Sequence, residues 1–419
     1  MEQETSHTVW PGETPVSEST ISLKTLTPLW TGGVDQNCDR LHETGLIGSL
    51  RWWYEALVRG LGGYVCDPTS DDQCRFDSKA YAAAKSSGSS IADAIREGTR
   101  GLCAVCYLFG CTGWARLFRL RAEDVPTTNL HFCTTLAMSK SWLARVFAGS
   151  SQGIGSVRVP YGDIKLAFST RGHDEPSSRG QFALALRLAA EYGGVGARLQ
   201  HGFGQVSLQL PSELRIGLGG EIKRLHEQFA KLRSSGADID TPFNLQNFVG
   251  LTYSVAATAF IDFARPNSVV GTNPGSANYV PCVFDLRYKG VGKWGMRQWL
   301  KQHGWRESDD PEKLEELDRL LGPRSQWGPK EREKKIDERR RTASRVFFGM
   351  PYRERASDSH YTLRMWAFWH HDLASRLPNL QALTDLCQEY VGYVFDKAAK
   401  VQSVASGREI LSKFKDETQ

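Results

Sequence analysis

Four cysteines in the N-terminal third of the chain have the spacing of a metal site. Cys103 and Cys106 form a Cys-x-x-Cys pair, and Cys66 and Cys74 precede it in a polar, irregular stretch. Four thiolates hold Zn²⁺ in a closed tetrahedral site, and such a stretch needs an added constraint to fold. We therefore predict one structural zinc ion bound by Cys66, Cys74, Cys103 and Cys106.

Other interpretations of the cysteines stay open. Cys38 and Cys111 are substitute ligands for the same ion, and the alternative to any metal is a set of buried free thiols. A redox role is disfavoured because no thioredoxin-like βαβ pattern surrounds the Cys-x-x-Cys pair. The chain has nine cysteines, an odd number, and its first residues lack the basic and apolar regions of a signal peptide. This indicates a cytoplasmic protein without a disulfide framework.

The segment 48–61 is a predicted helix that can bind an anion. Gly48 and Ser49 stand at its predicted start, where unpaired backbone N–H groups and the helix dipole favour a phosphate. Arg51 is predicted to lie on the face opposite the apolar stripe, and the indole of Trp52 is available for stacking. These four residues predict a contact with an RNA backbone. The alternative is structural, with the tryptophans in the core and the arginines in water.

A second motif, GGVGARLQHGFG at 193–204, follows a predicted helix and enters a strand. A nucleotide-binding P-loop runs from strand to helix and needs Gly-Lys-Ser/Thr, which is absent, so no nucleotide cofactor is expected. The glycines allow the backbone to approach a ligand closely. The alternative is a flexible turn. The RNA-contacting residues predicted in this loop are Arg198, Gln200, His201, Gly202 and Gly204.

A polar loop ahead of the predicted helix contains Asp35, Asp39, His42 and Glu43. Carboxylates and a histidine can support metal-assisted or acid–base cleavage of RNA. No second acidic motif pairs with them, so an ordinary polar loop is the favoured interpretation.

The elements that must position these residues alternate between strands and helices. Their order is β-α, an insert, then β-β-α-β, which is the ferredoxin-like, or split βαβ, pattern. It predicts an α+β fold whose antiparallel four-stranded sheet carries two helices on one face. The other face stays free, as in the RRM-like sheets that bind RNA. The predicted strands are 21–30, 130–138, 163–170 and 203–210, and the predicted helices are 48–61 and 180–192.

The second half of the chain weakly repeats the first. VGKWGMRQWLKQHG resembles IGSLRWWYEALVRG, and RVFFG resembles CYLFG farther along. Two echoes in the same order predict a second, degenerate ferredoxin-like domain. The predicted organisation is a flexible arm at 1–18, a first domain at 19–212 with a cysteine-containing insert at 64–125, a helical linker at 213–245, and a second domain at 246–419 with a charged insert at 304–344.

Composition excludes several classes of protein. Of the 419 residues, 40% are hydrophobic and 24% are charged, which is typical of a globular chain and not of a disordered one. No run of about 18 apolar residues occurs, so no membrane span is expected. The formal net charge of +5 permits nucleic-acid binding without requiring it.

Four motifs together resemble the RAMP superfamily of CRISPR proteins. They are TPLWTGG, ETGLIGSLRWWYEALVRGLGGYVCDP, CYLFGCTGWAR and GGVGARLQHGFGQV, in this order. The pattern is most similar to subunit one of type III-B Cmr effector complexes. The resemblance covers 24–123 and 180–210, is weaker at RVFFGMPYRE, and is absent from the charged insert.

The resemblance implies two ferredoxin-like domains in a subunit of a cytosolic antiviral ribonucleoprotein. Its expected partners are guide RNA, contacted near its 3′ region, single-stranded target RNA that pairs with the guide, and other RAMP subunits, without a membrane. In this family the start of the first helix and the glycine-rich loop approach the guide RNA backbone. Carried over here, these are Gly48, Ser49, Arg51 and Trp52, followed by the five loop residues named above.

The resemblance also bears on catalysis. Target cleavage in such complexes belongs to a repeated backbone subunit, which uses an aspartate in the loop after its first strand. We therefore expect this chain to bind RNA without cutting it. The alternative is a RAMP-type endoribonuclease that cuts guide precursor or target RNA with His42, Asp35 or Asp39, and a third interpretation is a scaffold that binds only neighbouring subunits.

Overall fold

The structure is a computed structural model of the chain. Residues 1–17 of the predicted arm, most of the charged insert, Asp35 and Asp39 lie outside the described residues. The described part contains two antiparallel four-stranded sheets and a three-stranded sheet, so the α+β class is confirmed. The described residues are 18–32, 38, 40–133, 156–171, 175–215, 217–236, 240–259, 279–281, 283–287, 293–308, 313–323, 343–355 and 357–417.

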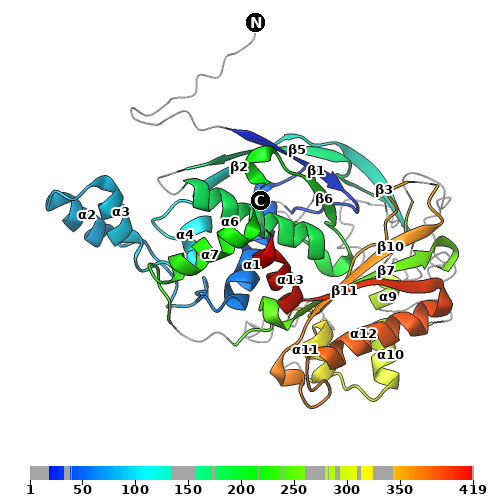
Figure 1. The fold of residues 1–419 in the computed structure, drawn as a ribbon. Helices are drawn as coiled ribbons and strands as arrows, with labels where there is room; N and C mark the ends of the chain where they lie inside the picture. The colour runs from blue at the N-terminus through cyan, green and yellow to red at the C-terminus, as the bar shows by residue number, and fades with distance from the viewer. Residues whose placement is uncertain are drawn as a thin grey trace, which may run out of the picture.

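The first sheet has the strand order β2-β5-β1-β6, and every neighbouring pair is antiparallel. The helices α1 and α6 form the two crossovers and cover the same face of the sheet (Figure 1). This is the order of a ferredoxin-like βαββαβ unit. The elements are β1 (Ser19–Thr25), α1 (Glu43–Gly60), β2 (Phe118–Asp124), β5 (Asp163–Thr170), α6 (Glu175–Tyr192) and β6 (Val206–Gln209).

Alternating side chains explain how this sheet is layered. Along β1, Ile21 and Leu23 are buried, whereas Thr20 and Lys24 are exposed. The buried side chains face α1 and α6, whose apolar residues belong to the same core cluster. The opposite face of the sheet carries the exposed side chains, because successive residues of a strand point to opposite sides.

One predicted strand belongs to a different sheet. The pattern predicted 130–138 as the second strand of the first sheet, but β2 occupies that position. Its residues Phe118 and Leu120 are buried in the core, and the strand pairs with β5 over nearly its whole length. The charged residues between them hide the alternation of FRLRAED in the sequence. The three-stranded sheet consists of β4 (Ser156–Pro160), β3 (Thr127–Cys133) and β8 (Tyr279–Pro281).

The second four-stranded sheet repeats the topology of the first. Its order is β11-β7-β10-β9, again with all pairs antiparallel. Short helices replace the first crossover helix, and α12 forms the second crossover. The elements are β7 (Phe248–Ala256), α9 (Phe284–Arg287), α10 (Met296–Gln302), α11 (Glu316–Leu321), β9 (Val346–Phe348), β10 (His360–Phe368), α12 (Leu380–Phe395) and β11 (Ala399–Ser406).

The two sequence echoes have different outcomes in this topology. The helix α10 follows the first strand of its sheet, as α1 does, which agrees with the first echo. The second echo fails, because 346–348 is a strand whereas its counterpart lies in the helix α4 (Ala104–Phe109). A buried apolar run of this length suits a strand or a helix equally, and the surrounding elements decide between them.

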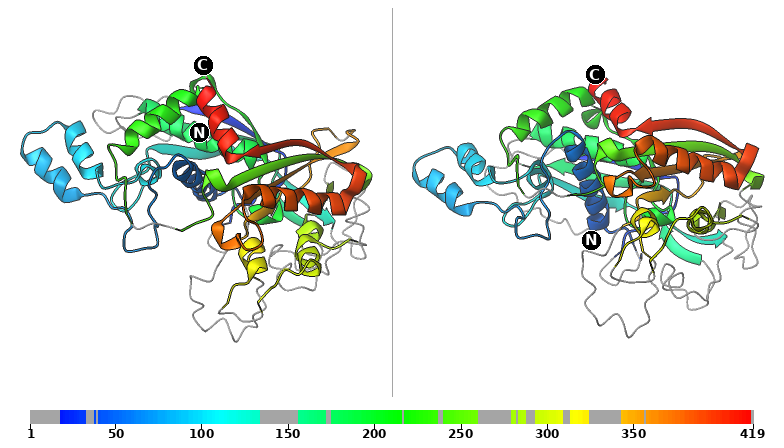
Figure 2. Two further views of the ribbon diagram at one scale, coloured as in Figure 1. Left: turned by 60° about the horizontal axis from the view of Figure 1, so that its bottom comes forward. Right: turned by 90° about the horizontal axis from the view of Figure 1, so that it is seen from below.

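The cysteine-containing segment and the C-terminal helix both pack against the first domain. The helices α2 (Ser78–Ser86) and α3 (Ile91–Thr99) project from the body of the molecule (Figures 1 and 2). The last helix, α13 (Gly407–Asp416), follows the second sheet but returns to the first domain, where it packs against α7 (Leu218–Phe229). No helix among the described residues is long and apolar enough to cross a membrane.

Candidate functional site

The four cysteines predicted to bind zinc come together in the structure. Cys66 and Cys74 lie in the connection after α1, Cys103 is the N-cap residue of α4, and Cys106 is in its first turn. All four are buried, and their Sγ atoms lie within 4.8 Å of one another. The Sγ of Cys66 is 3.5 Å from that of Cys106 and 3.9 Å from that of Cys103. We call this group the cysteine cluster.

The geometry of the cysteine cluster fits a tetrahedral metal ion. Zn–S bonds of about 2.3 Å imply Sγ–Sγ distances of about 3.8 Å, which the two measured distances bracket. The thiols also compete for protons. Hydrogen bonds from Cys106, Cys66 and Cys74 lower the pKa of Cys103, and the bond to Cys103 raises the pKa of each of the other three. A bound cation is what deprotonates the remaining thiols in such a site.

The substitute ligands occupy other positions. Cys111 is half-buried near the edge of the cysteine cluster, and a hydrogen bond with Cys106 lowers its pKa. Cys38 lies elsewhere, in the second core cluster, where its Sγ is 3.5 Å from the backbone nitrogen of Thr31. Cys38 is therefore not a ligand of this site.

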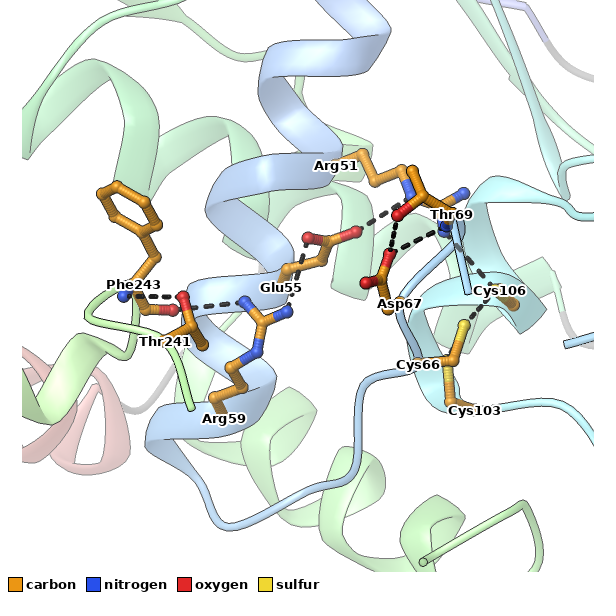
Figure 3. Close-up of polar contacts among 10 residues, drawn as sticks. All are labelled: Arg51, Glu55, Arg59, Cys66, Asp67, Thr69, Cys103, Cys106, Thr241 and Phe243. Carbon is orange, nitrogen blue, oxygen red and sulfur yellow. Dashed lines mark hydrogen bonds and ion pairs between the residues drawn. The ribbon is translucent and has the colours of Figure 1, made fainter. Parts of the chain in front are cut away.

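Arg51 points into the protein, which corrects its predicted position on a solvated helix face. Its Nε donates to Glu55 at 3.0 Å and its Nη2 to the Sγ of Cys106 at 3.4 Å (Figure 3). Its Nη1 donates to the carbonyl of Gly110 at 3.0 Å. The helix face predicted to be solvated is covered by the folded cysteine segment. A phosphate contact would require this guanidinium to leave those three partners.

The charged row on α1 continues past Arg51. Glu55 lies between Arg51 and Arg59, and Arg59 donates to the carbonyl of Phe243 at 3.2 Å (Figure 3). Burial raises the pKa of Glu55, and the two guanidinium groups oppose that rise. This row therefore connects the cysteine cluster to the segment that precedes the second domain.

The helix α1 begins five residues before the predicted start. Its N-cap is His42 and its first turn contains Glu43, whose carboxylate accepts from the backbone nitrogen of Ala122. Gly48 and Ser49 consequently lie in the second turn, where their backbone N–H groups belong to the helix ladder. The predicted helix start is therefore wrong, and neither residue stands at an open helix start.

The hydroxyl of Ser49 contacts the glycine-rich loop instead. Ser49 is buried, and its Oγ accepts from the backbone nitrogen of Gly196 at 2.8 Å. Gly48 is exposed, and a Cβ at this position would meet no atom within 4 Å. Ser49 therefore binds the glycine-rich loop through a hydrogen bond, whereas Gly48 has open space beside it.

The glycines of the loop allow the chain to approach itself. Gly196, Gly202 and Gly204 have φ angles of +87°, +86° and +82°, which favour glycine. The nitrogen of Gly204 donates to the carbonyl of Pro28, and the carbonyl of Gly202 accepts from Met350 in the second domain. Side chains at these positions would collide with backbone atoms. The loop therefore joins the β1–α1 connection to the second domain.

The polar residues of this loop have separate surroundings. Arg198 is half-buried, and its guanidinium carbon lies 4.0 Å from the ring centroid of Trp30, a cation–π contact. Burial, with smaller contributions from Arg287 and Arg198, lowers the pKa of His201 to about 3. His201 is therefore neutral near pH 7 and cannot neutralise a phosphate. Gln200 is half-buried beside them.

Trp52 lies in an aromatic group between the two domains. Its ring centroid is 5.2 Å from that of Phe243, 5.5 Å from that of Phe368 and 6.4 Å from that of Phe347, all edge-on. It also packs edge-on against Trp53. This arrangement matches the structural alternative for Trp52.

Sequence reasoning missed the side chains on the open face of the first sheet. Lys24, Arg119 and Lys165 are exposed on three neighbouring strands. In the β1–β5 register Ser22 faces Lys165, which places this lysine on the same side as Lys24. The alternating basic residues of FRLRAED were the available signal, and they were overlooked together with that strand.

A comparison with protein families finds a match within the first domain. Residues 22–207 match the RAMP superfamily. We call this matched region the RAMP domain. The match contains the cysteine cluster, α1 and the glycine-rich loop, so all of the site residues predicted from the sequence lie in the RAMP domain.

Solved structures resemble most of the chain at low identity. One is Cmr1 from Pyrococcus furiosus, 15% identical, which covers 84% of this chain and 88% of that chain with a TM-score of 0.38. Two are chains of the Type III-B Cmr-beta complex bound to cognate target RNA. One, which also contains AMPPnP, is 10% identical and covers 90% and 99% with a TM-score of 0.39. The other is 13% identical and covers 88% and 100% with a TM-score of 0.36. A comparison with curated proteins found no match. The similarity to the RAMP superfamily therefore rests on the match of residues 22–207.

Proposed function

We propose that this chain is an RNA-binding subunit of a type III-B (Cmr) CRISPR effector ribonucleoprotein that does not itself cleave RNA. The observation that carries the proposal is the match of residues 22–207 to the RAMP superfamily. The sequence motifs of the RAMP domain favour subunit one of such complexes. Its partners are then guide RNA near its 3′ region, the target RNA, and neighbouring RAMP subunits in the cytoplasm.

The open face of the RAMP sheet supports binding of the RNA backbone. The side chains that β1, β2, β5 and β6 turn to this face include Lys24, Arg119 and Lys165, and none of those four strands presents an aromatic side chain there. Cations without stacking platforms suit phosphates more than bases. Arg198 adds a further cation within the same domain.

Titration of RNA binding tests this proposal. The full chain, the variant Arg198→Ala and the control Arg96→Ala are titrated with three unrelated labelled RNAs at several salt concentrations. Arg96 is a suitable control because it is largely exposed on the projecting helix α3. Arg198→Ala should weaken all three RNAs alike and reduce the log–log salt slope by about 0.7. Loss of one RNA alone would indicate base readout and contradict the proposal.

The same incubation separates the alternatives. RNA that is bound and intact supports the binding subunit, cut RNA supports the endoribonuclease, and absence of binding supports the scaffold. In an assembled complex the double variant Asp35→Ala, Asp39→Ala should leave the rate of target cleavage unchanged. If that variant abolishes even one cut, the chain is catalytic and the proposal fails.

We further propose that the cysteine cluster binds one structural Zn²⁺. The four buried ligands and their spacing support this, and the ion would fold the segment between α1 and β2 onto the RAMP domain. Elemental analysis of tag-free protein should find zinc, and chelation should increase hydrogen exchange in α4. Folded, RNA-binding protein without zinc would contradict it.

A further inference from the structure

A second group of metal-ligating side chains lies in the other half of the molecule, after the end of β10. It consists of Asp240, His370 and His371, whose ligand atoms lie within 4.8 Å of one another. His370 and His371 follow Trp369, whose backbone nitrogen donates to the carbonyl of Asn247. The segment before β7 and the segment after β10 therefore meet at this point, although they are far apart in the sequence.

One carboxylate faces both imidazole rings. Oδ1 of Asp240 is 2.7 Å from Nε2 of His370, and Oδ2 is 3.7 Å from Nε2 of His371. The ring centroids of the two histidines are 4.1 Å apart. The Nε2 atoms and the carboxylate oxygens thus converge on one small volume. Two imidazoles and a carboxylate are a ligand set that suits Zn²⁺.

A second carboxylate holds the other side of the buried histidine. Oδ1 of Asp372 is 3.1 Å from Nδ1 of His370, and Asp372 also pairs with the guanidinium of Arg345, whose Nη2 is 2.7 Å from Oδ2. Metal-binding histidines usually donate their distal N–H to a carboxylate, which orients the ring and leaves the other nitrogen for the metal. Arg345 is buried, so this support is part of the packed domain.

Exposure shows which side of the group is open. The side chain of His370 is 8% exposed, whereas those of His371 and Asp240 are 66% and 70% exposed. An ion held by these three ligands would have one buried and two exposed contacts. Its remaining coordination position would therefore face solvent, unlike a closed four-cysteine site.

We propose that Asp240, His370 and His371 bind one Zn²⁺ ion with a solvent-facing coordination position. On binding, Nε2 of His370 becomes a ligand, while Nδ1 stays 3.1 Å from Oδ1 of Asp372. The ion links the segment before the second domain to the segment that follows β10. The site is independent of the proposed RNA-binding role, because its residues lie outside the RAMP domain.

Cobalt titration distinguishes this site from the cysteine cluster. Tag-free full-length protein is stripped with a chelator and titrated with Co²⁺, which gives thiolate charge-transfer bands in a cysteine site and only weak visible bands with nitrogen and oxygen ligands. Besides the thiolate bands of the cysteine cluster, the wild type should show one separate step of weak bands without thiolate character. His371→Ala and Asp240→Asn should each weaken that step at least about 10-fold. Both residues are exposed, so the fold should survive, as circular dichroism will verify.

The control is His360→Ala, which removes an exposed histidine at the opposite end of β10. This variant should bind Co²⁺ with the same weak-band step as the wild type. Zn²⁺ titration by calorimetry repeats the series with the proposed metal. The proposal is overturned if the wild type shows no step with nitrogen and oxygen ligands. It is also overturned if His371→Ala and Asp240→Asn bind Co²⁺ and Zn²⁺ as the wild type does, or if His360→Ala loses as much.

Discussion

At the scale of single residues, Arg51 shows how a charged side chain can be structural. The helical pattern of apolar residues predicts that its side chain faces solvent. Its Nε, Nη1 and Nη2 instead donate to Glu55, Gly110 and Cys106, respectively. These partners come from the helix itself and from the cysteine segment. Arg51 therefore positions that segment against α1, and its loss should be visible as lost stability.

We expect Arg51→Ala to lower the free energy of unfolding by about 1–3 kcal/mol. The change leaves Glu55 with Arg59 as its remaining guanidinium partner and removes the donor to the half-buried carbonyl of Gly110. Denaturant unfolding measures the change. The matched control Arg96→Ala removes an exposed ion pair and should change stability by less than about 0.5 kcal/mol. A stable Arg51→Ala protein with sharply weaker RNA binding would instead favour the phosphate contact.

His201 predicts an acid-dependent loss of stability. Its folded pKa of about 3 lies below the value of about 6.5 in an unfolded chain. As pH falls below about 6.5, the unfolded state takes up a proton that the folded state does not, so stability decreases toward pH 3. The loss from pH 7 to pH 5 should be about 2 kcal/mol. His201→Gln should remove this part of the pH dependence in unfolding curves, and an unchanged pH profile would contradict the burial argument.

At the scale of elements, the glycine-rich loop packs closely against other backbone segments of the same chain. Gly202 and Gly204 adopt left-handed backbone angles and contact the backbone of Met350 and Val195. Gly48, in contrast, lies inside the helix α1, and a Cβ at this position would meet no atom within 4 Å. All three glycines were predicted to contact RNA, but the structure requires glycine at Gly202 and Gly204 and has room for a side chain at Gly48.

We expect Gly204→Ala to lower the free energy of unfolding by at least about 2 kcal/mol, since alanine is strained at φ +82° and its Cβ would collide with the carbonyl of Val195. Gly48→Ala should raise it by about 0.5–1 kcal/mol, because alanine favours a helix interior. Thermal unfolding compares the two. If Gly48→Ala is stable but binds RNA less well, the backbone at Gly48 does approach RNA.

At the scale of the whole molecule, the two domains share elements across their boundary. The helix α13 follows the last strand of the second sheet, but Ile410, Leu411 and Phe414 are buried in the core of the RAMP domain. The carboxylate of Glu417 pairs with Arg187 on α6. The C-terminal helix therefore stabilises the first domain.

We expect Phe414→Ala to lower the free energy of unfolding by about 3 kcal/mol, since it leaves a cavity beside α6 and α7. Hydrogen exchange should increase in α7, which precedes the second sheet in the sequence. Lys413→Ala, on the exposed side of the same helix, should change little. If faster exchange after Phe414→Ala is confined to the second sheet, this coupling between domains is absent.

Local patterns predicted the parts of the molecule that depend on nearby residues. The order of strands and helices follows from apolar periodicity, and the cysteine cluster follows from ligand types within one short segment. The strand β2 escaped because its charged residues mask the alternation, and the helix start at Glu43 escaped because Gly48 looked like a boundary. Both errors concern the position or bounds of single elements.

Contacts between distant segments required the tertiary structure. Periodicity says which face of α1 is apolar, but not that the cysteine segment covers its charged face and takes the donors of Arg51. The composition of the loop shows that it is rich in glycine, but not that the carbonyl of Gly202 accepts a hydrogen bond from the backbone nitrogen of Met350. Asp240 and His370 converge only because β7 and β10 are paired neighbours in one sheet. The physical reason is that a sequence specifies which surfaces must be buried, whereas the packing of the complete chain selects the surface that buries each one.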